Sequence, residues 1–426
     1  MGLFAPQIND VTPVDGVRVL SLETGVHDVV TIAGSLLGGD VFSPVSNNAT
    51  ADMTASMLDQ GTEERDKFAI SEILEDVGAA LSFTSDNYRV RFGAICLSKD
   101  VGVVLEILAE QLRRPAFSEK ELNTLIKRRT GELKKQSEDT RTRATEAFLQ
   151  MLYPEGHPNF YIPMERQIAA TEAVQAHELR DFYKDNYGVG SLTIVAVGDV
   201  DHKKISDGVE KHFSGWQKSP LSINRSGDIT ANEIDEPIDR RIKMKGKTSA
   251  DVVFGHPIGI DRDHDDFRPL MLGHFILGGN FSARLMSTVR DQEGLTYGIQ
   301  SAVAGVDNGN DGYWYIWGTF APELVDQGRE SALRQLKTWI KQGVTEDELS
   351  RKKTTASGMY KVGLATTAGL AGQILATVEN GRELDYIDSY PDKINAVTLN
   401  EVNKAIKKYC NERELVTVVA GPTDKP

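Results

Sequence analysis

The chain repeats itself once, at an offset of roughly 220 residues, and this repeat limits its possible folds more than any other feature. Leu97–Asp100 opens an amphipathic segment with leucines on one face, and Phe320–Glu323 opens a similar segment 223 residues later. Ser118 and Thr345, 227 residues apart, each stand three residues before an acid, as a helix N-cap with a capping box does. Two copies of one pattern predict two similar domains.

Strands and long helices mix within each half. Leu192–Asp199 and Leu415–Gly421 are rich in β-branched residues, and each follows a helical segment. Tyr88–Phe92 alternates as a strand does, and the aromatic run Tyr313–Trp317 has the composition of a strand. The sequence therefore predicts an α+β fold of two homologous, pseudo-symmetric domains, each a mostly antiparallel sheet backed by helices.

A polar segment divides the two halves. Residues 214–239 contain Pro220, Gly227 and Pro237 and show little periodicity, so we interpret them as a linker. The predicted domains are then residues 1–213 at the N-terminus and residues 240–426 at the C-terminus.

Composition excludes several classes of partner. The 48 Lys and Arg against 62 Asp and Glu give a formal net charge of -14, which disfavours nucleic acid and anionic membranes as partners. No apolar stretch approaches the roughly 20 residues that span a bilayer, so we expect no membrane span. Cys96 and Cys410 form no metal or redox motif and are expected to be buried thiols. Met1–Asp10 has no features of an export signal, and we expect a soluble protein, cytoplasmic or periplasmic if bacterial.

The histidines do not form a metal site by themselves. None of the eight stands three or four residues from another, and no His-x-x-Glu-His motif occurs in either direction. Gly278 and Gly279 lack the further residues of a phosphate-binding loop, and a helix that ends in glycine explains them better. No Gly-x-Ser-x-Gly motif supports a serine hydrolase.

One segment places two polar side chains close together along the chain. Arg290 stands near the end of a predicted helix, and Tyr297 stands on the strand that follows Gly294. The two polar groups could converge on one point as a functional pair. Alternatively, Arg290 pairs with a nearby acid and Tyr297 packs as an amphipathic core residue.

The segments His274–Leu285 and Val289–Tyr297 together resemble the second half of the pitrilysin-type zinc metallopeptidases. This insulinase family includes insulin-degrading enzyme, the mitochondrial processing peptidase and the core subunits of cytochrome bc1. The resemblance covers nearly the whole chain and implies the same fold for it. Family members use an arginine and a tyrosine seven positions later as a substrate-binding pair, which the resemblance assigns to Arg290 and Tyr297.

The resemblance also implies a degenerate zinc motif in the first half. Active members carry His-x-x-Glu-His followed by Met-Leu-x-x-Gly-Thr, and Met57–Thr62 matches this second string. The alignment places Asp52, Ala55 and Ser56 at the His, Glu and His positions, and Glu132, 76 residues after Ser56, at the position of the third ligand. Three good ligands and a general base are needed for catalytic zinc, so we expect no metal in this chain.

Within the family, members without zinc ligands that keep the Arg/Tyr pair resemble one subunit of a heterodimer. The resemblance implies a zinc-bearing paralogous subunit as partner, a peptide substrate and no activity of this chain alone, although it would form part of a zinc metalloendopeptidase. Arg290 and Tyr297 would donate to the transition state in the partner's site. The alternative is a structural core-type subunit or a peptide-binding scaffold without a catalytic role. By analogy with the family, the peptide would add to an exposed sheet edge formed by Leu81, Ser82, Phe83, Thr84 and Ser85.

Overall fold

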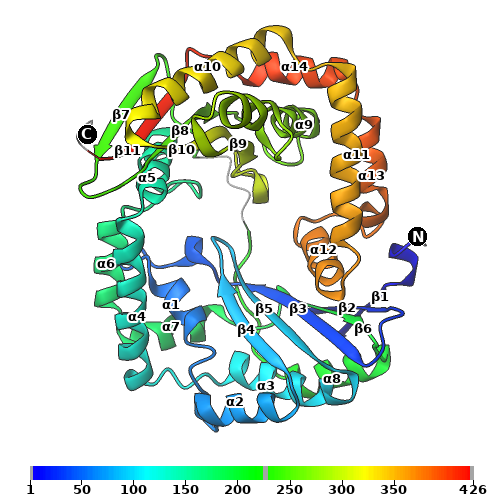
Figure 1. Cartoon of the computed structure of the whole chain (residues 1–426). Coiled ribbons are helices and arrows are strands. Elements are labelled where there is room, and N and C mark those ends of the chain that lie inside the picture. The colour runs from blue at the N-terminus through cyan, green and yellow to red at the C-terminus, as the bar shows by residue number, and fades with distance from the viewer. Residues whose placement is uncertain (1–2, 224–228, 423–426) are drawn as a thin grey trace. The chain divides into compact units, whose positions relative to one another are not determined.

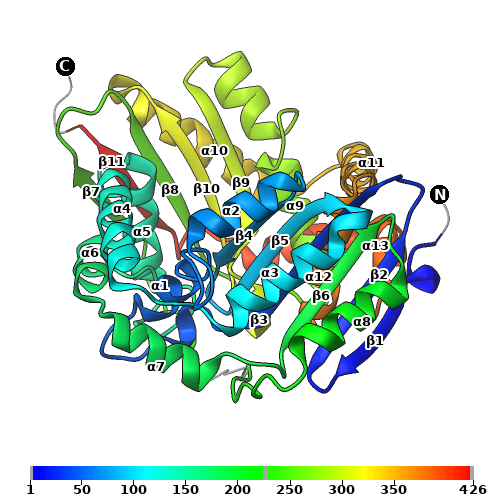
Figure 2. The same ribbon diagram turned by 90° about the horizontal axis from the view of Figure 1, so that it is seen from below.

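The computed structural model describes residues 3–223 and 229–422, and the chain divides into two compact units. Both units combine a sheet with helices, as the ribbon diagrams show (Figure 1, Figure 2). Unit 1 consists of Met1–Glu132, Glu165–Ile223 and Met359–Tyr390, and unit 2 of Leu133–Met164, Asn224–Gly358 and Pro391–Pro426. Each unit therefore contains one segment from the opposite half of the sequence.

Unit 1 is built on a six-stranded sheet. In spatial order its strands are β1 (Asn9–Val14), β2 (Val17–Glu23), β6 (Leu192–Gly198), β3 (Val29–Leu37), β5 (Arg89–Leu97) and β4 (Ala80–Ser85). Only β2 and β6 run parallel, and all other neighbours are antiparallel. β2 and β6 bury side chains on both faces, which explains their nearly continuous apolar sequences.

Helices cover both faces of this sheet. On one face lie α3 (Val101–Arg113) and α8 (His202–Phe213), which pack on each other, with α2 (Lys67–Asp76) beside α3 (Figure 2). The other face carries α12 (Thr367–Glu379), which packs on β3 and β6 and comes from the second half of the sequence. Next to β4 lies the short helix α1 (Thr50–Ser56), which packs on α7 (Ala176–Asn186).

Unit 2 is built on a five-stranded sheet. Its strands in spatial order are β7 (Ile238–Lys243), β11 (Val416–Gly421), β8 (Ala250–Pro257), β10 (Tyr313–Phe320) and β9 (Thr296–Ala304). Its helices are α9 (Phe267–Gly278) on β9, α10 (Val325–Gln342) on β8, α14 (Leu399–Tyr409) on α9 and α10, and α5 (Thr140–Leu152) on β8 and β11. α5 comes from the first half of the sequence, so the exchange of helices is reciprocal.

The two sheets share one topology. The order β2-β6-β3-β5-β4 in unit 1 corresponds to β7-β11-β8-β10-β9 in unit 2, and in each the first pair is parallel and the others antiparallel. The predicted α+β fold of two similar, mostly antiparallel domains is confirmed. The exchange of α5 and α12 adds a feature that the sequence pattern did not indicate.

The remaining helices connect these parts of the chain. They are α4 (Glu119–Ser137), α6 (Met164–Ala173), α11 (Glu346–Gly363) and α13 (Tyr386–Ala396), with short 3-10 turns at Ala5–Gln7, Asp40–Phe42, Ser98–Asp100, Asp307–Gly309 and Pro322–Leu324. The predicted capping box before α11 is present, because Thr345 and Glu348 exchange hydrogen bonds between side chain and backbone. In residues 3–223 and 229–422, no helix is both long and apolar enough to cross a membrane.

The predicted division of the sequence into an N-terminal domain (residues 1–213), a linker (residues 214–239) and a C-terminal domain (residues 240–426) stays a prediction. Residues 1–2, 224–228 and 423–426, which fall within these ranges, lie outside the described residues. Cys96 and Cys410 are free and buried, as predicted.

Candidate functional site

The predicted peptide-binding segment, Leu81–Ser85, lies in strand β4 at the end of the unit 1 sheet. Its partner is β5, and within the described residues β4 pairs with no second strand. Leu81 and Phe83 pack against the core, whereas Ser82 and Thr84 are exposed. The segment therefore has a free edge with the alternation of a half-buried strand.

The positions aligned with the zinc motif lie on helix α1, beside this edge strand. Ala55, at the position of the general base, is only 1% exposed and belongs to the hydrophobic core of unit 1. Asp52 is half-buried, with a side chain that is 26% exposed. The spacing of Asp52, Ala55 and Ser56 puts them on one side of the helix, as in the family motif.

Asp52 is already engaged by two other side chains. Ser85 donates a hydrogen bond from Oγ to Asp52 Oδ1 at 2.8 Å, which ties the end of β4 to α1. Arg129 on α4 forms an ion pair with Asp52, with 3.1 Å between Nη2 and Oδ2. The same guanidinium lies 3.7 Å from Glu132, measured from Nη1 to Oε2. The structure thus brings Asp52, Glu132 and Ser85 together through contacts that the sequence did not predict.

These residues do not fit a zinc ion. Ala55 has no polar atom, and the carboxylates of Asp52 and Glu132 both face Arg129. A catalytic zinc site needs three ligands that are free to bind metal and a general base; here both carboxylates already face a cation, and Ala55 provides no base. Across the described part of the chain, no group of three or more His, Cys, Asp or Glu side chains is arranged to hold a metal ion.

Arg290 and Tyr297 come together in unit 2, at the turn between a π-helical segment, Met286–Gln292, and strand β9. Gly294 makes this turn possible because its φ of 65° lies in the left-handed region. The backbone N–H groups of Gly294 and Leu295 donate to the carbonyls of Arg290 and Val289, which closes the helical segment.

The contact between the pair is a cation–π interaction. The guanidinium carbon of Arg290 lies 5.1 Å from the centroid of the Tyr297 ring. Tyr297 is 84% exposed, so the alternative in which it packs as a core residue is wrong. Arg290 has a carboxylate neighbour in Asp291, but the distance from Nε to Oδ1 is 3.9 Å.

Phe281 belongs to the same exposed surface as Arg290 and Tyr297, and the sequence pattern did not indicate it. Its ring centroid lies 5.6 Å from the guanidinium carbon of Arg290, and its side chain is 77% exposed. Lys352, buried on α11, fixes the loop that presents it, because Nζ donates to Asn280 Oδ1 at 2.6 Å and to Ser282 Oγ at 2.7 Å. The sequence did contain a signal for this residue, because Phe281 stands between the polar Asn280 and Ser282 after two glycines.

A buried polar cluster supports α9 and β9 behind the turn. His274 Nδ1 and Ser301 Oγ are hydrogen-bonded at 2.7 Å, and Gly278 packs so closely that a Cβ there would lie 2.5 Å from the Ser301 nitrogen. Burial, and next the charge of His256, lower the pKa of His274 to about 3. His274 is therefore neutral and structural at physiological pH.

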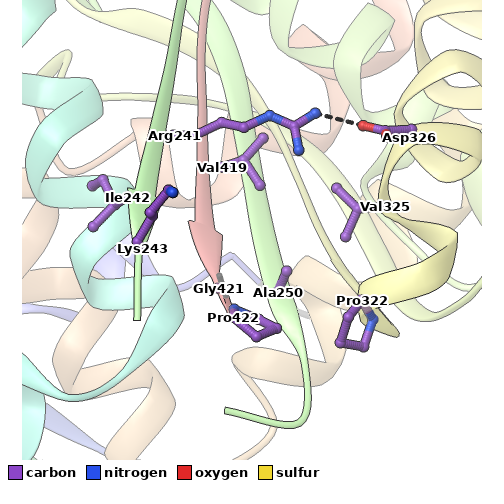
Figure 3. Close-up of a pocket in the computed structure, with 10 residues that line it drawn as sticks. All are labelled: Arg241, Ile242, Lys243, Ala250, Pro322, Val325, Asp326, Val419, Gly421 and Pro422. Carbon is purple, nitrogen blue, oxygen red and sulfur yellow. Dashed lines mark hydrogen bonds and ion pairs between the residues drawn. The ribbon is translucent and has the colours of Figure 1, made fainter. Parts of the chain in front are cut away.

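Unit 2 also contains pockets that hold none of the predicted site residues. Figure 3 shows one of ≈ 130 Å³ near the ends of β7, β11 and β8, where the ion pair between Arg241 and Asp326 spans 2.5 Å. A second pocket, of ≈ 470 Å³, is lined in part by Arg284, Glu348 and Lys352. Arg284 and Glu348 are joined by an ion pair of 2.6 Å, and Arg351 and Lys352 add two further positive charges to this lining.

Sequence models of one peptidase family match most of the chain. The model described as "Insulinase (Peptidase family M16)" matches residues 18–157. The model described as "Peptidase M16 inactive domain" matches residues 173–356.

Similar proteins come from bacteria and from mitochondria. An uncharacterized zinc protease of Streptomyces coelicolor is 24% identical over 90% of this chain and 83% of that protein. The probable beta subunit of the mitochondrial-processing peptidase of Arabidopsis thaliana is 21% identical over 99% and 79%. The non-peptidase homolog YmxG of Helicobacter pylori is 22% identical over 91% and 88%. A crystal structure of a peptidase M16 inactive domain from Pseudomonas fluorescens superposes with a TM-score of 0.86, with 22% identity and 98% of each chain covered.

Proposed function

Because the chain belongs to the peptidase M16 family as a catalytically inactive member, we propose that it is the zinc-less subunit of a heterodimeric metallopeptidase. In this proposal the partner is a zinc-bearing paralogue that supplies the metal and the general base. This chain binds the peptide and supplies Arg290 and Tyr297 to the partner's active site. Zinc would polarise the scissile carbonyl and activate the attacking water.

The exposed pair in unit 2 is the observation that carries the proposal. A tyrosine that is 84% exposed contributes little to folding, and its hydroxyl is available to a ligand. Arg290 is held in place by ring faces, which leave the edge of its guanidinium available as a hydrogen-bond donor. Donors of these two kinds stabilise the negative charge that develops on the carbonyl oxygen during peptide hydrolysis.

The free edge of β4 supports the peptide-binding part of the proposal. An extended peptide can pair with the main chain of Leu81–Ser85, and such pairing gives affinity with little sequence preference. The exposed Ser82 and Thr84 are small enough to leave the edge accessible. One relative is named as the beta subunit of the mitochondrial-processing peptidase, and this similarity supports a function as part of a complex.

Reconstitution tests the proposal. The chain should show no peptidase activity alone, and a zinc-bearing paralogue from the same genome should gain activity when the two are mixed. Metal analysis of the purified complex should give one zinc per pair of chains. Arg351→Ala is a matched control, because it removes a surface arginine of unit 2 whose side chain is 68% exposed and paired with Asp347. This variant should leave the gain of peptidase activity on mixing unchanged.

A complex that forms but is equally active with and without Arg290 and Tyr297 would contradict the catalytic role. The alternative of a structural core-type subunit or a peptide-binding scaffold would then take its place. Peptide binding by the isolated chain would distinguish the scaffold from the structural subunit.

A further inference from the structure

The position that the family motif assigns to zinc contains a cationic side chain, that of Arg129. Arg129 lies between the two acids aligned with the first and third ligands, 3.1 Å from Asp52 and 3.7 Å from Glu132. We propose that Arg129 is a resident cation that replaces the metal: it holds the metal-free site together and excludes zinc from it. This inference does not depend on the proposed role of the pair in unit 2.

The contacts of Arg129 join the elements that a metal would join. Asp52 is on α1, Glu132 is on α4, and Asp52 in turn accepts a hydrogen bond from Ser85 at the end of the edge strand β4. One guanidinium therefore links two helices directly and the peptide-binding strand through Asp52. Its planar group with several N–H donors can serve two carboxylates at once, which a lysine ammonium does less well.

The neighbouring arginine shows that this arrangement is specific to one position. Arg128 carries the same charge one residue earlier on α4, but its side chain is 61% exposed, and its Nε lies 3.9 Å from Glu132 Oε1. The Arg129 side chain is 36% exposed and reaches Asp52 as well. Arg128 is consequently a matched control, because it has the same charge, helix and acidic neighbour without the link to α1.

A fixed guanidinium opposes metal binding in two ways. Metal ligands must offer free lone pairs, and the carboxylates of Asp52 and Glu132 already face a cation. In addition, a positive charge roughly 4 Å from a dication is strongly repulsive in a partly desolvated site. Two histidines on α1 would therefore not be enough to rebuild a metal site while Arg129 stays in place.

Restoring the ligands with and without Arg129 tests the proposal. The starting variant is Asp52→His with Ser56→His, which rebuilds two ligands on one face of α1 and keeps Glu132 as the third. Ala55 stays in place, since it is buried in the core and corresponds to the general base and not to a ligand. To this variant we would add either Arg129→Ala or Arg128→Ala, and measure zinc content and affinity after confirming folding by circular dichroism.

The variant with Arg129→Ala should bind about one equivalent of zinc, at least about tenfold more tightly than the starting variant. The variant with Arg128→Ala should resemble the starting variant. Equal affinities in all three proteins would overturn the claim that Arg129 excludes metal. Failure of all three to bind zinc would overturn the claim that Arg129 stands at a metal position.

A double-mutant cycle on the unmodified chain tests the bracing role separately. Asp52→Asn and Arg129→Gln should each lower the melting temperature, and the double substitution should lower it by less than the sum of the two. Strictly additive shifts would show that the two side chains do not depend on each other, and would overturn the proposal.

Discussion

Each unit holds an arginine at a position of functional interest, and the surroundings of the two differ. In unit 1, Arg129 faces the carboxylates of Asp52 and Glu132, so its charge is balanced within the protein. In unit 2, Arg290 is flanked by the rings of Phe281 and Tyr297, and the Asp291 carboxylate lies 3.9 Å from its Nε. Carboxylates neutralise a guanidinium, whereas aromatic faces orient it and leave its charge largely available.

In our two proposals, this difference separates a structural arginine from a binding arginine. Substitutions around Arg129 should change stability and leave the kcat of the mixed complex unchanged. Substitutions at Arg290 or Tyr297 should change kinetics and leave stability unchanged.

The largest effect is expected for Arg290→Ala in the complex with the zinc-bearing subunit. Loss of a charged donor should lower kcat/KM by about 10²–10³, with a rise in KM as well as a fall in kcat, because the charge acts on bound substrate and transition state alike. Steady-state kinetics measure this, with Arg351→Ala as the control. A lower melting temperature with unchanged kcat/KM would show that Arg290, like Arg129, is a structural residue.

The pH dependence of the free energy of unfolding should depend on the buried His274, which packs behind the turn that carries Arg290. The pKa of His274 is about 3 in the folded chain, below its usual value, so the stability that depends on neutral His274 is present above about pH 6.5 and is lost as the pH falls. The expected slope is about 1.4 kcal/mol per pH unit between about pH 6 and 4.

His274→Gln should flatten this slope in denaturant titrations at each pH. His264→Gln provides a control, since His264 is exposed, with 41% of its side chain accessible. An unchanged slope in the His274 variant would show that other groups cause the acid sensitivity.

A smaller effect on stability is expected for Arg129→Met. The substitution keeps the length of the side chain but leaves Asp52 half-buried without its ion pair, which should cost about 1–2 kcal/mol in the free energy of unfolding. Arg128→Met should cost less than about 0.5 kcal/mol because it is mostly exposed. The kcat of the mixed complex should be the same for both variants, and a selective loss of kcat in Arg129→Met would remove the contrast between the two arginines.

Local patterns predicted much of the fold. The repeat predicted two similar sheets because equivalent apolar periodicities need equivalent packing partners. The capping box at Thr345 and the strands at Tyr313–Trp317 and Leu192–Gly198 follow from residue types that act within a few positions. The meeting of Arg290 and Tyr297 could also be expected, since one glycine turn separates them.

Packing between segments that are far apart in the sequence could not be predicted from such patterns. α5 and α12 are ordinary helices with an apolar face, and nothing in that face specifies which of two similar sheets it covers. Arg129 and Asp52 are far apart in sequence, and a charge on a helix is usually solvated, so their pairing required the structure. Phe281 was missed because its exposure contradicts the usual expectation for an aromatic residue.

The most direct test of the proposed function is the kcat of the mixed complex with Tyr297→Phe. The substitution removes one hydroxyl from a ring that is 84% exposed, so the free energy of unfolding should change by less than about 0.5 kcal/mol. If the hydroxyl donates to the oxyanion, kcat should fall by about 10²–10³ with little change in KM. An unchanged kcat in a fully assembled, zinc-loaded complex would contradict the proposal and leave this chain as a structural subunit.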